Sequence, residues 1–140
     1  MSGQAKNVVL KSVPPENSDA RALEKIQKAH DAKLEAEESA ANAKRVLADA
    51  RKERLDELTE CKENLKSVIN AAKGAGGKDS NKHLKSVIDA NEEWEETASE
   101  HDEKVRVAKE AFESASKALD DANGRLKETI TNSKQGELFD

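Results

Sequence analysis

The sequence of 140 residues predicts an all-α fold, a long antiparallel two-helix coiled-coil hairpin. First, 38% of the residues are charged and 2% are aromatic, which suits long paired helices and does not suit a thick globular core. Second, apolar residues recur at alternating steps of three and four from Leu84 to Thr129, which forms one narrow seam along a helix. Third, a similar seam precedes a glycine-rich segment, so the chain supplies its own partner helix.

The composition and charge exclude several other classes of protein. High charge and low aromatic content also occur in disordered chains, but a disordered segment has no reason to keep a seven-residue repeat. The net charge of −5 gives no electrostatic argument for nucleic acid or an anionic membrane. The apolar runs are too short for a transmembrane helix or a secretory signal, and the single Cys61 excludes an internal disulfide. We therefore expect a cytoplasmic protein.

Residues 1–16 are predicted to form an N-terminal arm. The arm contains the apolar run Val8–Leu10 and ends near Pro14 and Pro15, which disfavour a helix running back through them. Two interpretations stay open, a mobile arm or a short apolar hook for a partner.

The first helix is predicted over residues 17–73, with Asn17 or Ser18 as its N-cap. Two successive steps of four, from Ala50 to Arg54 to Leu58, interrupt the heptad once and predict a stutter. The predicted seam consists of Leu23, Ile26, Ala29, Ala32, Ala36, Ala40, Ala43, Leu47, Ala50, Arg54, Leu58, Cys61, Leu65, Val68 and Ala72.

A glycine-rich loop over residues 74–79 separates this helix from a second helix over residues 80–134, capped by Asp79 or Ser80. A loop this short requires the helices to be antiparallel. Gly124 marks either a kink in the second helix or a tolerated glycine on its outer face. The second seam consists of Leu84, Val87, Asn91, Trp94, Ala98, His101, Val105, Ala108, Phe112, Ala115, Leu119, Ala122, Leu126 and Thr129.

When the chain is folded at the glycines, large residues of one seam fall opposite small residues of the other, which fills space without clashes. The five layers are Phe112 with Ala43, Leu119 with Ala36, Leu126 with Ala29, Leu47 with Ala108, and Leu58 with Ala98. Charges agree with this register, because Arg51, Lys52 and Arg54 fall near Glu100, Asp102 and Glu103.

A second apolar stripe lies beside each seam. It consists of Leu34, Ala41, Ala48, Leu55, Lys62 and Ile69 on the first helix, and of Ile88, Ala111, Ala118 and Ile130 on the second. Two interpretations stay open: either two hairpins pair as a homodimeric four-helix bundle, or the alanines simply promote helix on the surface.

The sequence offers no constellation for catalysis, and we expect no enzyme, no cofactor and no metal ligands. The loop Gly74–Ser80 departs from a phosphate-binding loop because Asp79 follows Gly77–Lys78 and helices flank it. The three histidines, His30, His83 and His101, have no neighbours at metal-ligand spacing. The basic residues Lys44, Arg45, Arg51, Lys52 and Arg54 lie beside an acidic helix without interleaved aromatics, so direct nucleic-acid binding is not expected.

The tail over residues 135–140 is the most specific functional signal. Its sequence is Gln-Gly-Glu-Leu-Phe-Asp, and its Phe139 is one of two phenylalanines in the chain. The spacing Gln-x-x-Leu-Phe resembles the short peptide by which bacterial polymerases and repair proteins dock onto the replication sliding clamp. The resemblance implies that Gln135 hydrogen-bonds at the mouth of the clamp pocket and that Leu138 and Phe139 fill an apolar cleft. Gly136 departs from the apolar residue usual at the second place.

Together with the predicted hairpin, the resemblance implies a non-enzymatic coiled-coil adaptor or modulator, bacterial or phage-encoded, that docks through Gln135, Leu138 and Phe139 onto a sliding clamp during DNA replication. Two alternatives remain, a scaffolding protein that acts by self-association and a nucleic-acid binder that uses the basic residues.

Overall fold

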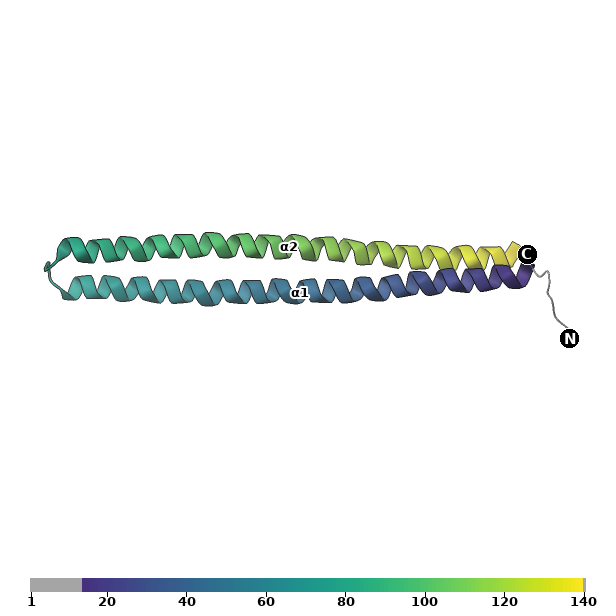
Figure 1. Cartoon of the computed structure of the whole chain (residues 1–140), viewed down its shortest axis with the longest axis horizontal. Coiled ribbons are helices and arrows are strands. Elements are labelled where there is room, and N and C mark those ends of the chain that lie inside the picture. The colour runs from purple at the N-terminus through teal and green to yellow at the C-terminus, as the bar shows by residue number, and fades with distance from the viewer. Residues whose placement is uncertain (1–13, 140) are drawn as a thin grey trace. The chain divides into compact units, whose positions relative to one another are not determined.

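The computed structural model describes the backbone of residues 14–139, and side-chain exposure for residues 19–133. Helix α1 (Pro14–Gly74) and helix α2 (Ser80–Phe139) are joined by a turn at residues 75–79 (Figure 1). No strand occurs within residues 14–139, and the two helices pack against each other. The predicted all-α two-helix hairpin is confirmed.

Both helices extend beyond the predicted bounds. Helix α1 begins at Pro14 and not at residue 17, because the first turn of a helix needs no backbone donor and accepts proline. Helix α2 continues to Phe139, so the backbone of residues 135–139 is helical and the predicted tail is not a separate extension. Of the predicted N-terminal arm, residues 1–13 lie outside the described residues.

The chain divides into two compact units, and each contains a segment of both helices. Unit 1 comprises Met1–Ala41 and Ser114–Asp140, and unit 2 comprises Asn42–Glu113. In unit 1, Lys28 and Glu128 line the same surface hollow, and in unit 2, Arg54 meets Asp102. In unit 2, Ala72 and His83 line another hollow next to the turn, so the two helix segments of this unit run antiparallel, whereas the shared hollow of unit 1 shows that segments of both helices lie side by side.

The buried face of α1 follows the predicted seam with two exceptions. Leu23 is 67% exposed and Ala32 is also exposed, while Ala22 and Lys33 take the partly buried positions. Leu23 was assigned to the seam because it is large and apolar, whereas the heptad phase of the seam residues that follow it places the buried position at Ala22. The two four-residue steps through Arg54 are confirmed, because residues 50, 54 and 58 are all partly buried.

The buried face of α2 also departs from the prediction near its start. Leu84 is 59% exposed and Asn91 is exposed, whereas His83 is partly buried and Ala90 is 6% exposed. From His83 onward the buried positions follow the heptad except at one place, where two steps of four follow each other, from residue 97 to 101 and from 101 to 105. This second stutter is centred on His101, and the predicted seam lacks it because a seam that begins at Leu84 has a different phase before His101.

All ten residues of the five predicted layers are buried or partly buried, so each lies on the buried face as predicted, and the pairing of large with small residues stays a prediction. The seam is thin. Among residues 19–133, the buried apolar residues are Ala40, Leu47, Ala90, Ala108 and Ala122. Such a seam is typical of a helix pair, where each side chain meets one partner helix and water on its flanks.

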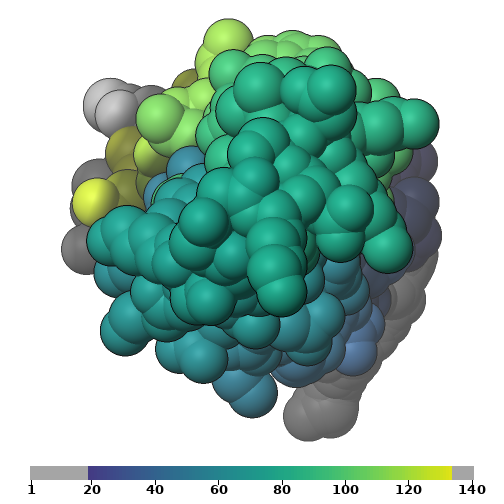
Figure 2. Space-filling view, turned by 90° about the vertical axis from the view of Figure 1, so that its left-hand side faces the viewer, coloured from purple at the N-terminus to yellow at the C-terminus, as the bar shows by residue number. Residues whose placement is uncertain are grey.

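The turn between the helices uses left-handed backbone at Gly76 (φ 57°), Gly77 (φ 93°) and Asp79 (φ 51°). Glycine accepts this conformation without a steric penalty, and aspartate tolerates it better than most residues. The Asp79 carbonyl accepts the first helical hydrogen bond of α2, from the His83 amide at 3.0 Å, and Ser80 Oγ donates to the Gly77 carbonyl at 2.7 Å. Figure 2 faces this end, so that the teal atoms nearest the viewer belong to the turn and the adjoining ends of the two helices.

Gly124 of unit 1 is exposed, and a β-carbon built on it would meet nothing within 4 Å. It is therefore an outer-face glycine inside α2. Over the described part of the chain, neither helix has a stretch long and apolar enough to cross a membrane.

Candidate functional site

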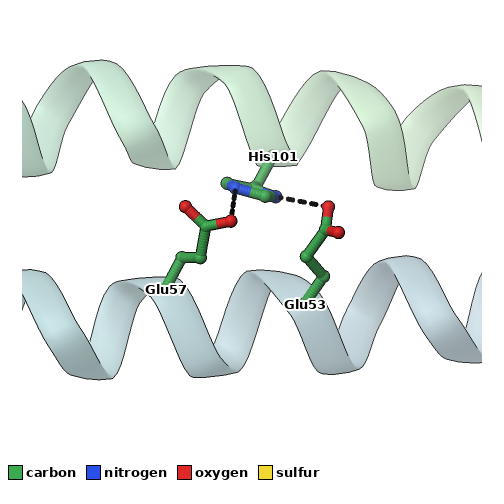
Figure 3. A group of neighbouring side chains, drawn as sticks. All are labelled: Glu53, Glu57 and His101. Atoms are coloured by element: carbon green, nitrogen blue, oxygen red, sulfur yellow. Dashed lines mark ion pairs between the residues drawn. The ribbon is translucent and has the colours of Figure 1, made fainter.

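A polar layer lies in the middle of the seam of unit 2, at the point where both helices carry a stutter. Its centre is His101, which is 4% exposed and is the one buried polar residue among residues 19–133. Because His101 occupies a seam position of α2, its ring points toward α1 (Figure 3). A buried polar ring needs partners, since an unpaired buried polar group costs about 1–3 kcal/mol.

Two glutamates of α1 flank the ring. Glu53 and Glu57 are four residues apart, so they lie on the same face of the helix, one turn apart. Glu57 Oε2 lies 3.4 Å from His101 Nε2, and Glu53 Oε1 lies 3.7 Å from His101 Nδ1. The imidazole is therefore held between two carboxylates, one facing each ring nitrogen (Figure 3).

The histidine is not fully satisfied by these contacts. Its Nδ1 atom is buried and has no hydrogen-bond partner, because Glu53 lies beyond hydrogen-bonding distance. The glutamates themselves are open to water, with side chains 53% and 52% exposed. The layer therefore combines a buried ring nitrogen that has no hydrogen-bond partner with two carboxylates that are exposed to water and free to turn.

Further charges border the layer. Arg54 Nε donates a hydrogen bond of 2.7 Å to Asp102 Oδ1, which confirms one of the predicted charge contacts between the helices. Lys104 Nζ lies 3.6 Å from Glu53 Oε1. Glu53 thus faces two positive or potentially positive groups, Lys104 and His101, whereas Glu57 faces His101.

Glu103, which was predicted to face the basic residues of α1, pairs within its own helix. Arg106 donates to both carboxylate oxygens of Glu103 and, through Nη1, to Glu110 Oε2 at 2.7 Å. The hydrogen bond from Arg106 holds the pKa of the Glu103 carboxyl below its ordinary value, and the same bond raises the pKa of the guanidinium. All three side chains are exposed, so this cluster orders the surface of α2 without forming a site.

The chemistry that this layer supports is cation binding. One ligand atom from each of Glu53, Glu57 and His101 can be chosen so that all three lie within 4.8 Å of one another. Imidazole nitrogen and carboxylate oxygen are ligands of Zn²⁺ and similar divalent ions. No spacing within one segment of the sequence predicts this group, because its ligands come from two helices that are far apart in the chain.

A shallow apolar groove of about 530 Å³ lies beside the layer in unit 2. Val46, Ala50, Val107 and Ala111 contribute its apolar surface, and charged residues including Glu53 and Lys104 also line it. Val46 is 57% exposed and Val107 is 53% exposed. Ala111 had been assigned to the second apolar stripe, whereas the two valines were not predicted.

The predicted partner-binding residues Gln135, Leu138 and Phe139 belong to the last helical turns of α2, in unit 1. Their side chains lie outside residues 19–133, for which exposure is described. The structure therefore places their backbone in a helix of unit 1, whereas the polar layer belongs to unit 2. The chain matches no protein-family model, no curated protein and no solved structure.

Proposed function

We propose that this protein is a non-enzymatic coiled-coil adaptor or modulator that docks through its C-terminal peptide onto a bacterial replication sliding clamp. The observation that carries the proposal is the spacing of Gln135, Leu138 and Phe139 at the end of a helical hairpin. We place this activity in the cytoplasm of a bacterium, with a bacterial or phage gene as its source.

The helical end of α2 is compatible with such docking. The last carbonyls of a helix have no partners within the helix, so its terminal turn opens at lower cost than its interior. A peptide released from that turn can adopt the conformation of an apolar pocket, with Leu138 and Phe139 as anchors and the Gln135 amide at the mouth. The rest of the hairpin would then provide the surface through which the adaptor contacts a second partner.

Binding of the full-length protein to a purified bacterial sliding clamp, measured by calorimetry, tests the proposal. The double variant Leu138→Ala with Phe139→Ala removes both apolar anchors and is expected to weaken binding more than about tenfold. The matched control is Leu34→Ala with Leu55→Ala, which removes two exposed leucines of α1 and should leave the affinity unchanged. Absence of binding by the unmodified protein, or equal binding by the tail variant, would contradict the proposal.

A second function, scaffolding by self-association, is favoured by exposed apolar side chains that one hairpin leaves in water. They include Leu34, Val46, Leu55, Ile88, Val107 and Ile130, each at least 45% exposed. A second copy of the hairpin that covers the groove at Val46 and Val107 would remove apolar surface from water in both copies.

Sedimentation velocity across a concentration series tests this alternative. Self-association predicts a sedimentation coefficient that rises with concentration, and Val46→Lys with Val107→Lys should abolish the rise because two charges would enter the interface. A monomer at every concentration would contradict it.

A further inference from the structure

We propose that Glu53, Glu57 and His101 form a binding site for one divalent transition-metal ion of the zinc class, built between α1 and α2 of unit 2. The site is independent of the C-terminal peptide. It rests on three observations: a buried histidine with an unpartnered ring nitrogen, two carboxylates on adjacent turns, and the short separations among their ligand atoms.

The unpartnered nitrogen is the observation that points to a cation. His101 Nδ1 is buried and makes no hydrogen bond. An apolar side chain could occupy the same seam position without leaving a buried polar atom unpaired. A neutral imidazole nitrogen that lacks a proton is a strong ligand for zinc-class ions, and the second nitrogen then donates to a nearby acceptor. Here a carboxylate faces each nitrogen, so whichever nitrogen binds the ion already has one carboxylate ligand beside it (Figure 3).

The distances fit an ion with modest movement of the glutamates. Ligands about 2.1 Å from a tetrahedral ion lie about 3.4 Å from each other. The two observed histidine–glutamate separations are 3.4 and 3.7 Å. They are measured to different ring nitrogens, so one glutamate must swing toward the nitrogen that binds the ion. Both glutamate side chains are about half exposed, which leaves them free to turn, and water completes the coordination.

Positive groups around the site oppose the ion. Lys104 lies 3.6 Å from Glu53, and Arg54 stands next to Glu53 on α1, although its guanidinium is hydrogen-bonded to Asp102. Lys104 competes with the ion for the same carboxylate. The proposal therefore predicts that removal of the Lys104 charge tightens metal binding, an effect opposite in sign to the loss of a ligand.

Calorimetric titration of the metal-free, full-length protein with ZnCl₂ tests the proposal. We expect one ion per chain, with binding weakened at least about tenfold by His101→Gln and by Glu53→Gln with Glu57→Gln. The matched controls are His30→Gln and Cys61→Ser, which remove other zinc-binding groups and should leave the site unchanged. Titration with MgCl₂ should show no binding that depends on His101, because Mg²⁺ prefers oxygen ligands.

Two further variants keep the test decisive. If His101→Gln lowers the helical circular dichroism, the zinc affinity of Glu57→Gln decides between the outcomes, because the Glu57 side chain is half exposed and can be changed without disturbing the seam. Lys104→Gln is expected to tighten zinc binding several-fold. The proposal is overturned if zinc does not bind, if the unmodified protein and both ligand variants bind equally, or if Cys61→Ser alone removes the binding.

Discussion

Substitution of Leu47 by alanine measures how much one seam layer contributes to folding. Leu47 is 5% exposed, and it was predicted to lie opposite Ala108, which is 6% exposed. The substitution removes three carbon groups, and at about 0.8 kcal/mol for each buried group the transfer term is about 2.4 kcal/mol. Since only one partner helix and water surround the gap, the additional cavity term is small, and because the better helix propensity of alanine returns a few tenths of a kcal/mol, we expect a net loss of about 2 kcal/mol.

Leu55→Ala is the matched control in the same helix and the same unit. Leu55 is 64% exposed, so only about a third of the transfer term applies, or about 0.9 kcal/mol. The better helix propensity of alanine offsets a few tenths of this loss. The two leucine substitutions should therefore differ by about 1.5 kcal/mol in the free energy of unfolding.

Urea unfolding followed by circular dichroism at 222 nm checks the difference. With a slope of about 1.5 kcal/mol per molar urea, Leu47→Ala should unfold at about 1 M less urea than Leu55→Ala. Repetition at several protein concentrations separates folding from self-association. Equal losses for the two variants, or a larger loss for Leu55→Ala, would refute the assignment of the seam.

Three further predictions concern single positions. Gly124→Ala should stabilise the protein by up to about 1 kcal/mol, because alanine favours helix more than glycine and the space around Gly124 is open. Gly77→Ala should destabilise the protein by about 1 kcal/mol, because the φ of Gly77 is 93°. Thermal unfolding measures both changes, and a shift of the same sign for the two variants would contradict the turn geometry. The Glu103 carboxyl should titrate by NMR below its ordinary pKa, and Arg106→Gln should return it toward that value. The lowered pKa means that this pair stabilises the fold above the unfolded-state pKa of Glu103, and that the contribution is lost as pH falls through the folded value; an unchanged titration in Arg106→Gln would count against the hydrogen bond. His101→Leu should raise the melting temperature of the metal-free protein by removing a buried unbonded nitrogen, a gain of about 1 kcal/mol, and a lower melting temperature would show that its carboxylate contacts stabilise more than its burial costs.

The fold class and most of the seam were predictable because helix pairing depends on a repeat that is visible in one sequence. Steps of three and four, broken once at Arg54, identified the buried face of α1, and a glycine-rich segment located the turn. The errors arose where hydrophobicity and phase disagree. Leu23 and Leu84 are large and apolar, yet each lies one residue away from the seam position, which Ala22 and His83 occupy.

The ends of the helices were less predictable. Gly136 is the only residue after position 134 that favours a helix stop, and because no proline follows it, α2 continues to Phe139. At the other end, Pro14 was expected to exclude helix, although the first turn accepts it. The resemblance of Gln135, Leu138 and Phe139 to a clamp-binding peptide stays a prediction.

The polar layer could not be predicted as a site from spacing alone. His101 belongs to the predicted seam, but nothing in the sequence distinguishes Glu53 and Glu57 from the other glutamates of the first helix. Their proximity to the histidine depends on the register of the two helices and on two stutters that lie side by side, of which only the one at Arg54 was predicted. Contacts between helices require that register to be known to within one residue.

Antiparallel pairing of α1 with α2 within each unit is tested most directly by distances between spin labels. Pairs on exposed outer faces are Glu63 with Glu92 in unit 2 and Glu24 with Thr131 in unit 1, in a Cys61→Ser background. Helix axes about 10 Å apart, with labels on opposite outer faces, predict narrow distributions below about 35 Å for both pairs, unchanged by dilution with unlabelled protein. Broad distributions, or short distances that vanish on dilution with unlabelled protein, would contradict the pairing.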